Sequence, residues 1–175
     1  MEFFEPRPLR ADDAVAAFDC GSGELNRFLD RFAWQSQQGQ SARTYVTVSD
    51  SGEVAGYYTL AYGSVEHADA PERTRKGLAK HPVPVLVLAR LAVAQKFQGR
   101  GIGKHLLRDA LLRTLQAADI AGLRAVVVHA KDEGARRFYE KYRFEPFPGD
   151  PLKLALLLHL SPYGRRFRHM NHSVS

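Results

Sequence analysis

Three glycines spaced by two residues could form a phosphate-binding turn. They lie in one short stretch, Gln98-Gly99-Arg100-Gly101-Ile102-Gly103. If a helix starts there, its first backbone N–H groups have no acceptor, and together with the helix dipole they attract phosphate. The Rossmann pattern fails because the sixth position from Gly99 is Lys104, and the P-loop fails because Gln98 stands where its first glycine belongs. The loop therefore predicts a site for a phosphate-bearing ligand, with a glycine turn without a ligand as the alternative.

A strand and a helix on either side would hold this loop in place. Residues 83–93 are nearly continuous in Val, Leu and Ala, which is typical of a strand that is covered on both faces. From Ile102 the apolar residues recur with helical spacing to about Ala118. The sequence thus predicts a buried strand, a glycine turn and a helix in succession.

Earlier in the chain, a helix and a hairpin are expected. The helix has one apolar face and ends at Gly39; that face is formed by Leu25, Phe28, Leu29, Phe32 and Ala33. Residues 44–48 and 54–62 are β-rich runs joined by a turn, and residues 68–80 form a polar, basic loop.

The later part of the chain alternates strand and helix. Strands are predicted at 123–128 and 152–160, with a helix between them that begins at the N-cap Asp132. This order predicts an α/β (α+β) layer structure with a mixed central sheet and flanking helices. We expect a single domain over 1–162, followed by a basic tail over 163–175.

The composition indicates a globular protein. Of the 175 residues 45% are hydrophobic, and no apolar run is long enough to cross a membrane. Acidic residues stand near Met1 where a signal peptide would have basic ones. A single cysteine, Cys20, excludes an internal disulfide framework and is usual in a cytoplasmic protein. The histidines are scattered, so no metal site is predicted.

Two linked segments resemble the GNAT family of acetyltransferases. The glycine stretch after Leu91-Ala92-Val93 resembles the family's acyl-CoA signature, Q/R-x-x-G-x-G/A, and residues 137–144 resemble its A-x-x-F-Y-x-x-x-G-F segment. The resemblance implies a GNAT fold, with a splayed strand pair, and acetyl-CoA as co-substrate. The implied acetyl-CoA contacts are Leu91, Ala92, Val93, Gln98, Gly99, Arg100, Gly101, Ile102, Gly103 and Lys104.

The same resemblance assigns the general acid. It implies that Tyr139 protonates the departing CoA thiolate, whereas spacing alone would allow an aromatic core residue. One position departs from the family pattern, because Arg143 stands where the family usually has glycine. A helix C-terminus often takes a left-handed conformation there, which costs a non-glycine residue about 1 kcal/mol.

A closer resemblance covers most of the chain. Residues 18–21, 25–29, 42–46, 71–73, 82–85 and 106–117 are similar to the TacT-type toxins of toxin–antitoxin pairs. This resemblance implies acetylation of the amino acid on charged tRNA, neutralisation by a ribbon-helix-helix antitoxin, and a homodimer. The apolar strand expected at 152–160 could pair across such a dimer.

The charge distribution supports a polyanionic substrate independently. Residues 71–108 contain nine basic residues and one acidic residue, although the whole chain has a net charge of only +6. CoA would use part of this charge and tRNA phosphates could use the rest, although a solvated basic surface is the common alternative. The candidate tRNA contacts are Arg43, Arg73, Arg75, Lys76 and Arg90.

Two other functions remain open from the sequence. The same fold could acetylate a small-molecule amine or a protein N-terminus, which predicts turnover without tRNA. A catalytically silent basic module would instead show no thermal shift with acetyl-CoA, whereas a ligand at 100 times its Kd stabilises by about 2.7 kcal/mol.

Overall fold

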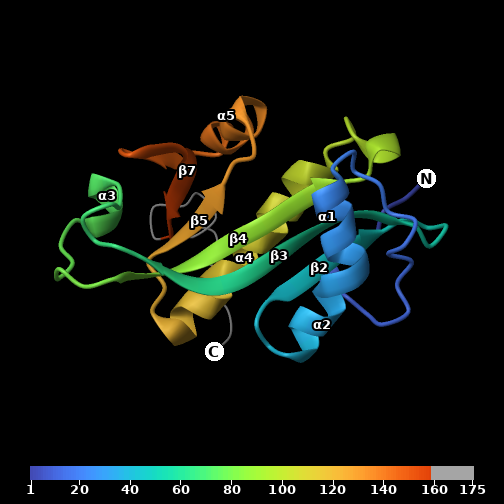
Figure 1. Cartoon of the computed structure of the whole chain (residues 1–175), viewed down its shortest axis with the longest axis horizontal. Coiled ribbons are helices and arrows are strands. Elements are labelled where there is room, and N and C mark those ends of the chain that lie inside the picture. Colours follow the sequence, from blue (N-terminus) through green and yellow to red (C-terminus); the bar gives the residue numbers. More distant parts are fainter. Residues whose placement is uncertain (159–175) are drawn as a thin grey trace, which may run out of the picture. The chain divides into compact units, whose positions relative to one another are not determined.

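The computed structural model describes residues 1–158, and Figure 1 shows its elements. The strands are β1 (Arg7–Pro8), β2 (Arg43–Val48), β3 (Val54–Val65), β4 (Val83–Val93), β5 (Ala125–His129), β6 (Glu145–Phe147) and β7 (Asp150–Leu157). The helices are α1 (Gly23–Arg27), η1 (Phe28–Phe32), α2 (Ala33–Gln38), α3 (Glu72–Arg75), η2 (Gln95–Phe97), α4 (Ile102–Ala121) and α5 (Glu133–Lys141). The strands form one mixed sheet in the order β1-β2-β3-β4-β5-β7-β6, which confirms the predicted fold class.

The chain divides into two compact units. One contains residues 1–61 and 88–110, and the other contains residues 62–87 and everything described from 111 onward. The divisions fall inside β3, β4 and α4, so these three elements contribute residues to both units. The tail expected at 163–175 and the end of the strand expected at 160 lie outside the described residues.

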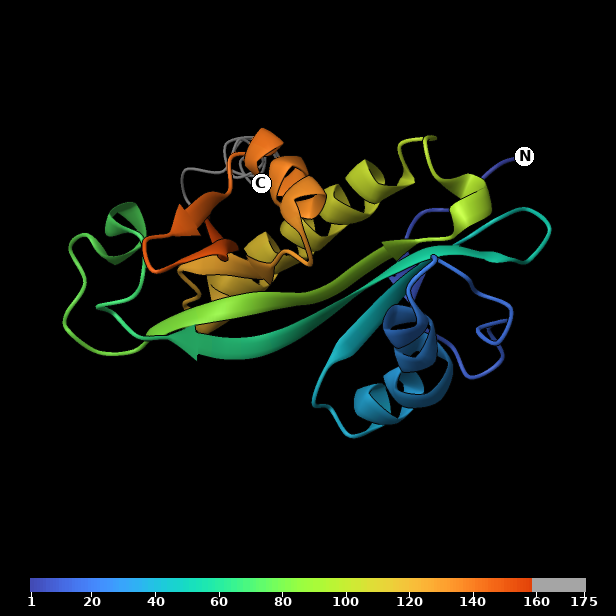
Figure 2. The ribbon, with the colours of Figure 1, turned by 45° about the horizontal axis from the view of Figure 1, so that its top comes forward.

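In the first unit, β3 is packed on both faces. A side chain at Gly56 would come within 2.8 Å of Leu106 and 3.3 Å of Ile102, so the start of α4 lies directly against this position. The next residue, Tyr57, points to the opposite face, where its hydroxyl donates to the Leu25 carbonyl at 2.8 Å. Figure 2 shows α1 and α2 on that face and the start of α4 on the other.

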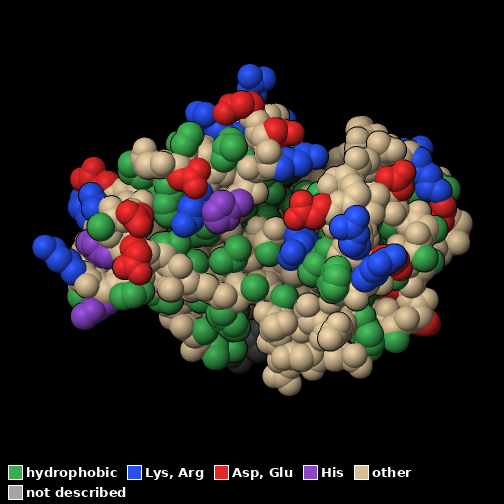
Figure 3. Space-filling model, viewed as in Figure 1, with side chains coloured by type: hydrophobic (Ala, Val, Ile, Leu, Met, Phe, Trp, Pro, Cys, Tyr) green, Lys and Arg blue, Asp and Glu red, His purple; other side chains and the backbone are tan. Residues whose placement is uncertain are grey.

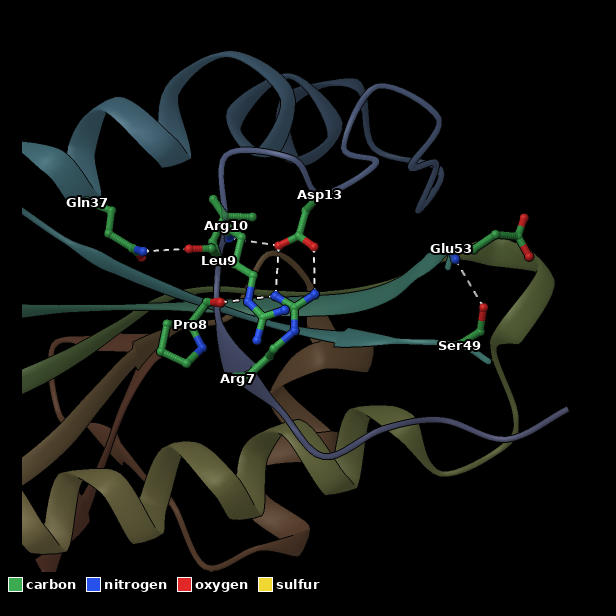
Figure 4. A network of polar contacts seen from close by, with 8 residues as sticks. All are labelled: Arg7, Pro8, Leu9, Arg10, Asp13, Gln37, Ser49 and Glu53. Carbon is green, nitrogen blue, oxygen red and sulfur yellow. Dashed lines mark hydrogen bonds and ion pairs between the residues drawn. The ribbon is translucent and has the colours of Figure 1, made fainter. Parts of the chain in front are cut away.

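A partly buried ion pair orders the N-terminal segment, and a hydrogen bond from α2 ties this segment to the rest of the unit. Arg7 donates to both carboxylate oxygens of Asp13, at 2.7 and 2.9 Å, and the Arg10 N–H donates to the same carboxylate at 2.8 Å. Gln37 of α2 donates to the Leu9 carbonyl at 2.8 Å (Figure 4). The Gln37 side chain thereby joins α2 to the backbone of the residue that follows β1.

The first helical segment differs from the prediction in its register. It contains a π-helical turn, η1, so Phe28 and Ala33, five residues apart, are both buried. The wider turn rotates Phe32 away from the core, and half of its surface is exposed. Gly39 ends the segment as predicted, but the expectation that Phe32 is a core residue was wrong.

The second unit has its own apolar core. Val83 and Val85 of β4 pack with Val127 of β5, Phe147 of β6 and Ala155 of β7. Strand β7 pairs antiparallel with β5 on one side and β6 on the other. Its main-chain groups are therefore used within the chain, and it is not an edge that could extend the sheet across a dimer.

Four short elements were not predicted: β1, β6, α3 and η2. Strands β1 and β6 have two and three residues, too few to show a period-two pattern, and each contains a proline. Helix α3 lies inside the segment expected to be a loop. Arg124 anchors α3 by donating to the carbonyls of Thr74 and Lys76, at 2.9 and 3.2 Å, and a contact so distant in sequence gives no local signal.

Candidate active site

The glycine loop has the backbone of an anion-binding turn. Gly99 and Gly101 have φ angles of +81° and +79°, in the left-handed region that favours glycine. A Cβ at either position would meet nothing within 4 Å, so these glycines are required by backbone conformation and the space beside them is open. Left-handed residues on both sides of Arg100 are typical of turns in which successive N–H groups face one side and bind an anion.

Helix α4 begins directly after this turn. It starts at Ile102, and its first turn is completed when the His105 N–H donates to the Gly101 carbonyl at 3.1 Å. By the geometry of any helix start, the N–H groups of Ile102, Gly103 and Lys104 have no acceptor within the helix. They are available to a phosphate, as the sequence predicts.

Side chains brace the loop from behind. Gln98 donates from its amide to the Val93 carbonyl at 3.0 Å, which ties the loop to the end of β4. Phe97 is buried and meets the ring of Phe3 edge-on, and the Lys96 ammonium forms an ion pair with Glu53. Lys96 is therefore paired with Glu53, whereas Arg100 and Lys104 are both exposed.

Strand β4 supplies the second part of a CoA site. Strand β4 has eleven residues and its neighbour β5 has only five. The Arg124 N–H, just before β5, donates to the Pro84 carbonyl near the start of β4, so residues 91–93 extend beyond the end of β5 and leave an open strand edge there. An edge strand can pair with an extended ligand that carries amide groups. Leu91 and Val93 are half-buried and Ala92 is buried, which places the three predicted contacts on this strand.

Tyr139 lies in the second unit, on α5. Asp132 caps this helix by accepting from the Ala135 N–H at 2.8 Å, as predicted. The tyrosine ring is buried between Phe138 and Phe144, at centroid distances of 5.2 and 5.4 Å. Burial raises the pKa of Tyr139 to about 12, so its phenol stays protonated at neutral pH. Among the described residues none hydrogen-bonds to its hydroxyl, which is not fully enclosed.

The turn after α5 has the conformation expected from the family pattern. Arg143 has a φ angle of +72°, and its N–H donates to the Glu140 carbonyl at 3.0 Å. The adjacent Phe144 N–H returns to the Tyr139 carbonyl at 3.2 Å. Arg143 therefore occupies a left-handed position without being a glycine.

The five candidate tRNA contacts fall in both units. Arg43 and Arg90 belong to the first, and Arg90 stacks on Phe28 with its guanidinium carbon 3.6 Å from the ring centre. Arg73, Arg75 and Lys76 belong to the second, on or next to α3. Figure 3 shows blue and red side chains interspersed on the viewed face, so the net positive charge of the sequence does not form one uninterrupted basic surface there.

Two contacts of these basic residues could not be read from the sequence. Arg73 pairs with Glu145 at 2.9 Å, across 72 positions of the chain, and Arg90 reaches Phe28 across 62. In residues 1–158 no group of three or more His, Cys, Asp or Glu is placed to hold a metal ion.

The sequence model of the Acetyltransferase (GNAT) family matches residues 11–144. The chain belongs to the GNAT family. The GNAT signature residues 98–103 and the segment around Tyr139 both lie within the match. Their resemblance to GNAT enzymes, inferred from the two segments, is thereby confirmed.

Individual GNAT proteins are also similar along most of the chain. A tRNA-acetylating toxin of Mycobacterium tuberculosis (strain ATCC 25618 / H37Rv) is 49% identical over 153 residues, which cover 87% of this chain and 91% of the toxin. The structure of AtaT complexed with acetyl-methionyl-tRNAfMet has a TM-score of 0.83 and 26% identity, and covers 97% of this chain and 99% of AtaT.

A third similar structure contains two ligands. It is a tyrosine-to-phenylalanine mutant of the AtaT toxin, bound to the C-terminus of the antitoxin AtaR and to acetyl-CoA. Its TM-score is 0.75 at 26% identity, and it covers 89% of this chain and 93% of that one. The resemblance to TacT-type toxins is thus confirmed at the level of sequence and of fold.

Proposed function

We propose that this GNAT protein transfers the acetyl group of acetyl-CoA to the α-amino group of aminoacyl-tRNA, and thereby blocks translation as the toxin of a toxin–antitoxin pair. The observation that carries the proposal is the 49% identity to a tRNA-acetylating toxin over 87% of the chain. It accords with the solved complex of AtaT with acetyl-methionyl-tRNAfMet, a protein of the same fold.

Acetyl-CoA fits the loop and the strand edge of the first unit. The N–H groups from Gln98 to Lys104 hold the pyrophosphate, since Gly99 and Gly101 leave open space where the phosphates approach. Residues 91–93 pair with the amides of the pantetheine arm along the edge of β4. The thioester supplies the activated acetyl group.

The substrate amine needs little activation. A free α-amino group has a pKa of about 7.7–8.0, against about 10.4 for a lysine side chain, so about 10–15% of it is neutral and nucleophilic at pH 7, some hundreds of times the neutral fraction of a lysine. A strong general base is therefore dispensable, and we assign none.

The phenol of Tyr139 is protonated at neutral pH and can donate to the sulfur of the departing CoA. With a pKa of about 12, the phenol is a weaker acid than an exposed tyrosine. Its proton is therefore still in place when the C–S bond breaks, and Tyr139 donates it to the sulfur as negative charge builds up there.

The partners follow from the same proposal. A ribbon-helix-helix antitoxin neutralises the enzyme, in keeping with the AtaT structures bound to AtaR, and the enzyme acts as a homodimer in the cytoplasm, where charged tRNA is found. Among the described residues, no helix has both the length and the apolar character needed to span a bilayer.

The proposal is tested by incubating the protein with labelled acetyl-CoA and a pool of charged tRNA, followed by mass analysis of the released aminoacyl groups. We expect label on charged tRNA and none on uncharged tRNA. Transfer to small amines or protein N-termini alone, with none to tRNA, would contradict the proposal.

The role of Tyr139 is tested in the same assay. Tyr139→Phe removes only the hydroxyl, so the fold and acetyl-CoA binding should persist while kcat falls about 10²-fold or more. Tyr142→Phe, on the next turn, is the matched control and should stay within about two-fold of the parent. An unchanged kcat in Tyr139→Phe would remove this residue from the mechanism.

A further inference from the structure

A small cavity in the second unit brings two arginines together. It has a volume of about 180 Å³, several times the ~30 Å³ share of a water molecule in the liquid. Arg73 and Thr74 line it from α3, Arg143 and Glu145 line it from the turn after α5, and residues 155–157 of β7 line the rest. Arg143 belongs to none of the sites assigned above.

The charges in the cavity do not balance. Arg73 is paired with Glu145 at 2.9 Å, which leaves the Arg143 guanidinium without a carboxylate partner among the lining residues. Leu156 and Leu157 are buried, so one wall is apolar and lowers the local dielectric. Arg143 is exposed and the Arg73 side chain is 68% exposed, so an anion can reach both guanidinium groups from solvent while it lies against this apolar wall.

The backbone at Arg143 offers a second reason to assign it a ligand. A left-handed φ of +72° is sterically unfavourable for an arginine and free of that cost for glycine. Arginine therefore stands at a position where glycine would give a more stable backbone. Hydrogen bonds hold the backbone of this turn in place, because the N–H groups of Arg143 and Phe144 donate to the carbonyls of Glu140 and Tyr139 on α5.

The cavity lies in the same unit as Tyr139. Arg143 follows Tyr139 by four residues, in the turn that ends α5. A phosphate bound at Arg143 would hold the tRNA backbone within the same unit as the tyrosine. The opposite wall is fixed as well, since Arg124 anchors α3 through the Thr74 and Lys76 carbonyls.

We propose that this cavity binds a backbone phosphate of the tRNA substrate, with Arg143 as its primary ligand and Arg73 as a second ligand restrained by Glu145. The proposal rests on the proposed function and names a contact within it. Arginine suits this role because its planar fork can donate two hydrogen bonds to a phosphate.

The decisive variant is Arg143→Gly, because stability and substrate binding should change in opposite directions. Glycine relieves the left-handed backbone, so Tm should rise by about 2–4 °C. Loss of the phosphate contact should raise KM for charged tRNA roughly 3- to 10-fold and reduce the salt dependence of kcat/KM by about one unit of log–log slope. The kcat at saturating tRNA and the Kd for acetyl-CoA should not change.

A second variant tests the restraint on Arg73. Glu145→Gln frees the Arg73 guanidinium and removes a like-charge repulsion of phosphate, so KM for charged tRNA should fall about two-fold or more. The matched control for Arg143→Gly is Arg31→Gln, which also removes one exposed cation but lies on η1, outside the cavity. If Arg31→Gln raised KM as much as Arg143→Gly does, the effect would be general electrostatics and the proposal would be overturned.

Direct binding separates this proposal from the proposed function. The Kd of labelled, uncharged tRNA is measured by fluorescence anisotropy for the parent protein and each variant, without acetyl-CoA. If Arg143→Gly binds tRNA more weakly than the parent, the phosphate site is supported. If the parent at the same time acetylates no charged tRNA, the proposed function is contradicted. If the parent acetylates charged tRNA, and Arg143→Gly has the same KM, Kd and salt slope as the parent, the phosphate site alone is overturned. This is the result expected if the cavity binds a protein carboxylate instead of a phosphate.

Discussion

The carboxylate of Asp13 accepts three hydrogen bonds that fix the conformation of the N-terminal segment. Its side chain is only 7% exposed. Burial alone would raise its pKa, but hydrogen bonds from Arg7 and from the Arg10 N–H, with the nearby positive charges, hold the pKa below its usual value. A carboxylate with a lowered pKa stabilises the folded state above about pH 4 and loses that contribution as the pH falls through its folded pKa.

Asp13→Asn should therefore lower the free energy of unfolding by about 1–3 kcal/mol at pH 7, since Arg7 would lose a charged, two-pronged partner. Urea unfolding across a pH series measures this, and the gap between parent and variant should narrow below about pH 4. The neighbouring Asp12 is exposed, so Asp12→Asn should stay within about 0.5 kcal/mol. A gap that stays constant down to pH 3 would show that the ion pair is not its source.

Single residues differ in how far the sequence predicts them. Gly99, Gly101 and Tyr139 stand in motifs with a fixed order, so their places could be predicted from spacing and resemblance. The stacking of Arg90 on Phe28 could not, because the two lie far apart in the chain and no local pattern links them. The left-handed turn at Arg143 was expected, but its place beside Arg73 required the structure.

At the level of elements, the glycine loop can be tested by its conformation. Gly101→Ala places a methyl group on a residue with a φ of +79° and should cost about 1–2 kcal/mol of stability. It should also weaken acetyl-CoA binding roughly 10-fold, because a shift in this turn misaligns several N–H groups. Calorimetric titration with acetyl-CoA measures the change in Kd.

The hairpin between β2 and β3 supplies the control for this change. Gly52 has a φ of +85° and, as at Gly101, a methyl group added there would meet nothing within 4 Å. Gly52→Ala should cost a similar amount of stability and leave acetyl-CoA binding unchanged. Equal losses of affinity in both variants would mean that strain anywhere in the unit affects the ligand, and that the loop has no special part.

Long periodic elements were the most predictable. Strand β4 was predicted with its observed bounds, and α4 begins at the predicted Ile102, because buried strands and amphipathic helices carry strong patterns. The π turn at Phe28–Phe32 has no such signal, since its residues also satisfy a regular helical period. Phe28 at the start of this turn stacks on Tyr57 with ring centres 6.4 Å apart, and Phe32 at its end is half exposed.

For the whole molecule, buried tyrosines set the behaviour at high pH. Burial raises the pKa of Tyr57 well above its ordinary value and that of Tyr139 to about 12. Above pH 10 the unfolded chain releases these protons while the folded chain retains them, so stability falls as the pH rises. The two-unit shift of Tyr139 corresponds to ~3 kcal/mol by pH 12.

Tyr139→Phe should therefore flatten the alkaline limb of the stability curve, by up to ~1.4 kcal/mol per pH unit between pH 10 and 12. Urea unfolding from pH 8 to 11.5 measures the slope. Tyr62 is 71% exposed, so Tyr62→Phe should leave the slope as it is in the parent. Coincident curves for the parent and Tyr139→Phe would contradict the burial of this phenol.

The three elements shared by the two units bear on how such a chain can change over evolution. The divisions at 61/62, 87/88 and 110/111 cut β3, β4 and α4 in their interiors. No single crossover between two genes could exchange one unit and leave the other intact, because each unit is encoded in two separated stretches. A recombinant that joins two parent genes at any point within the chain therefore contains at least one unit assembled from both parents, whose core must pack with residues that were not selected together.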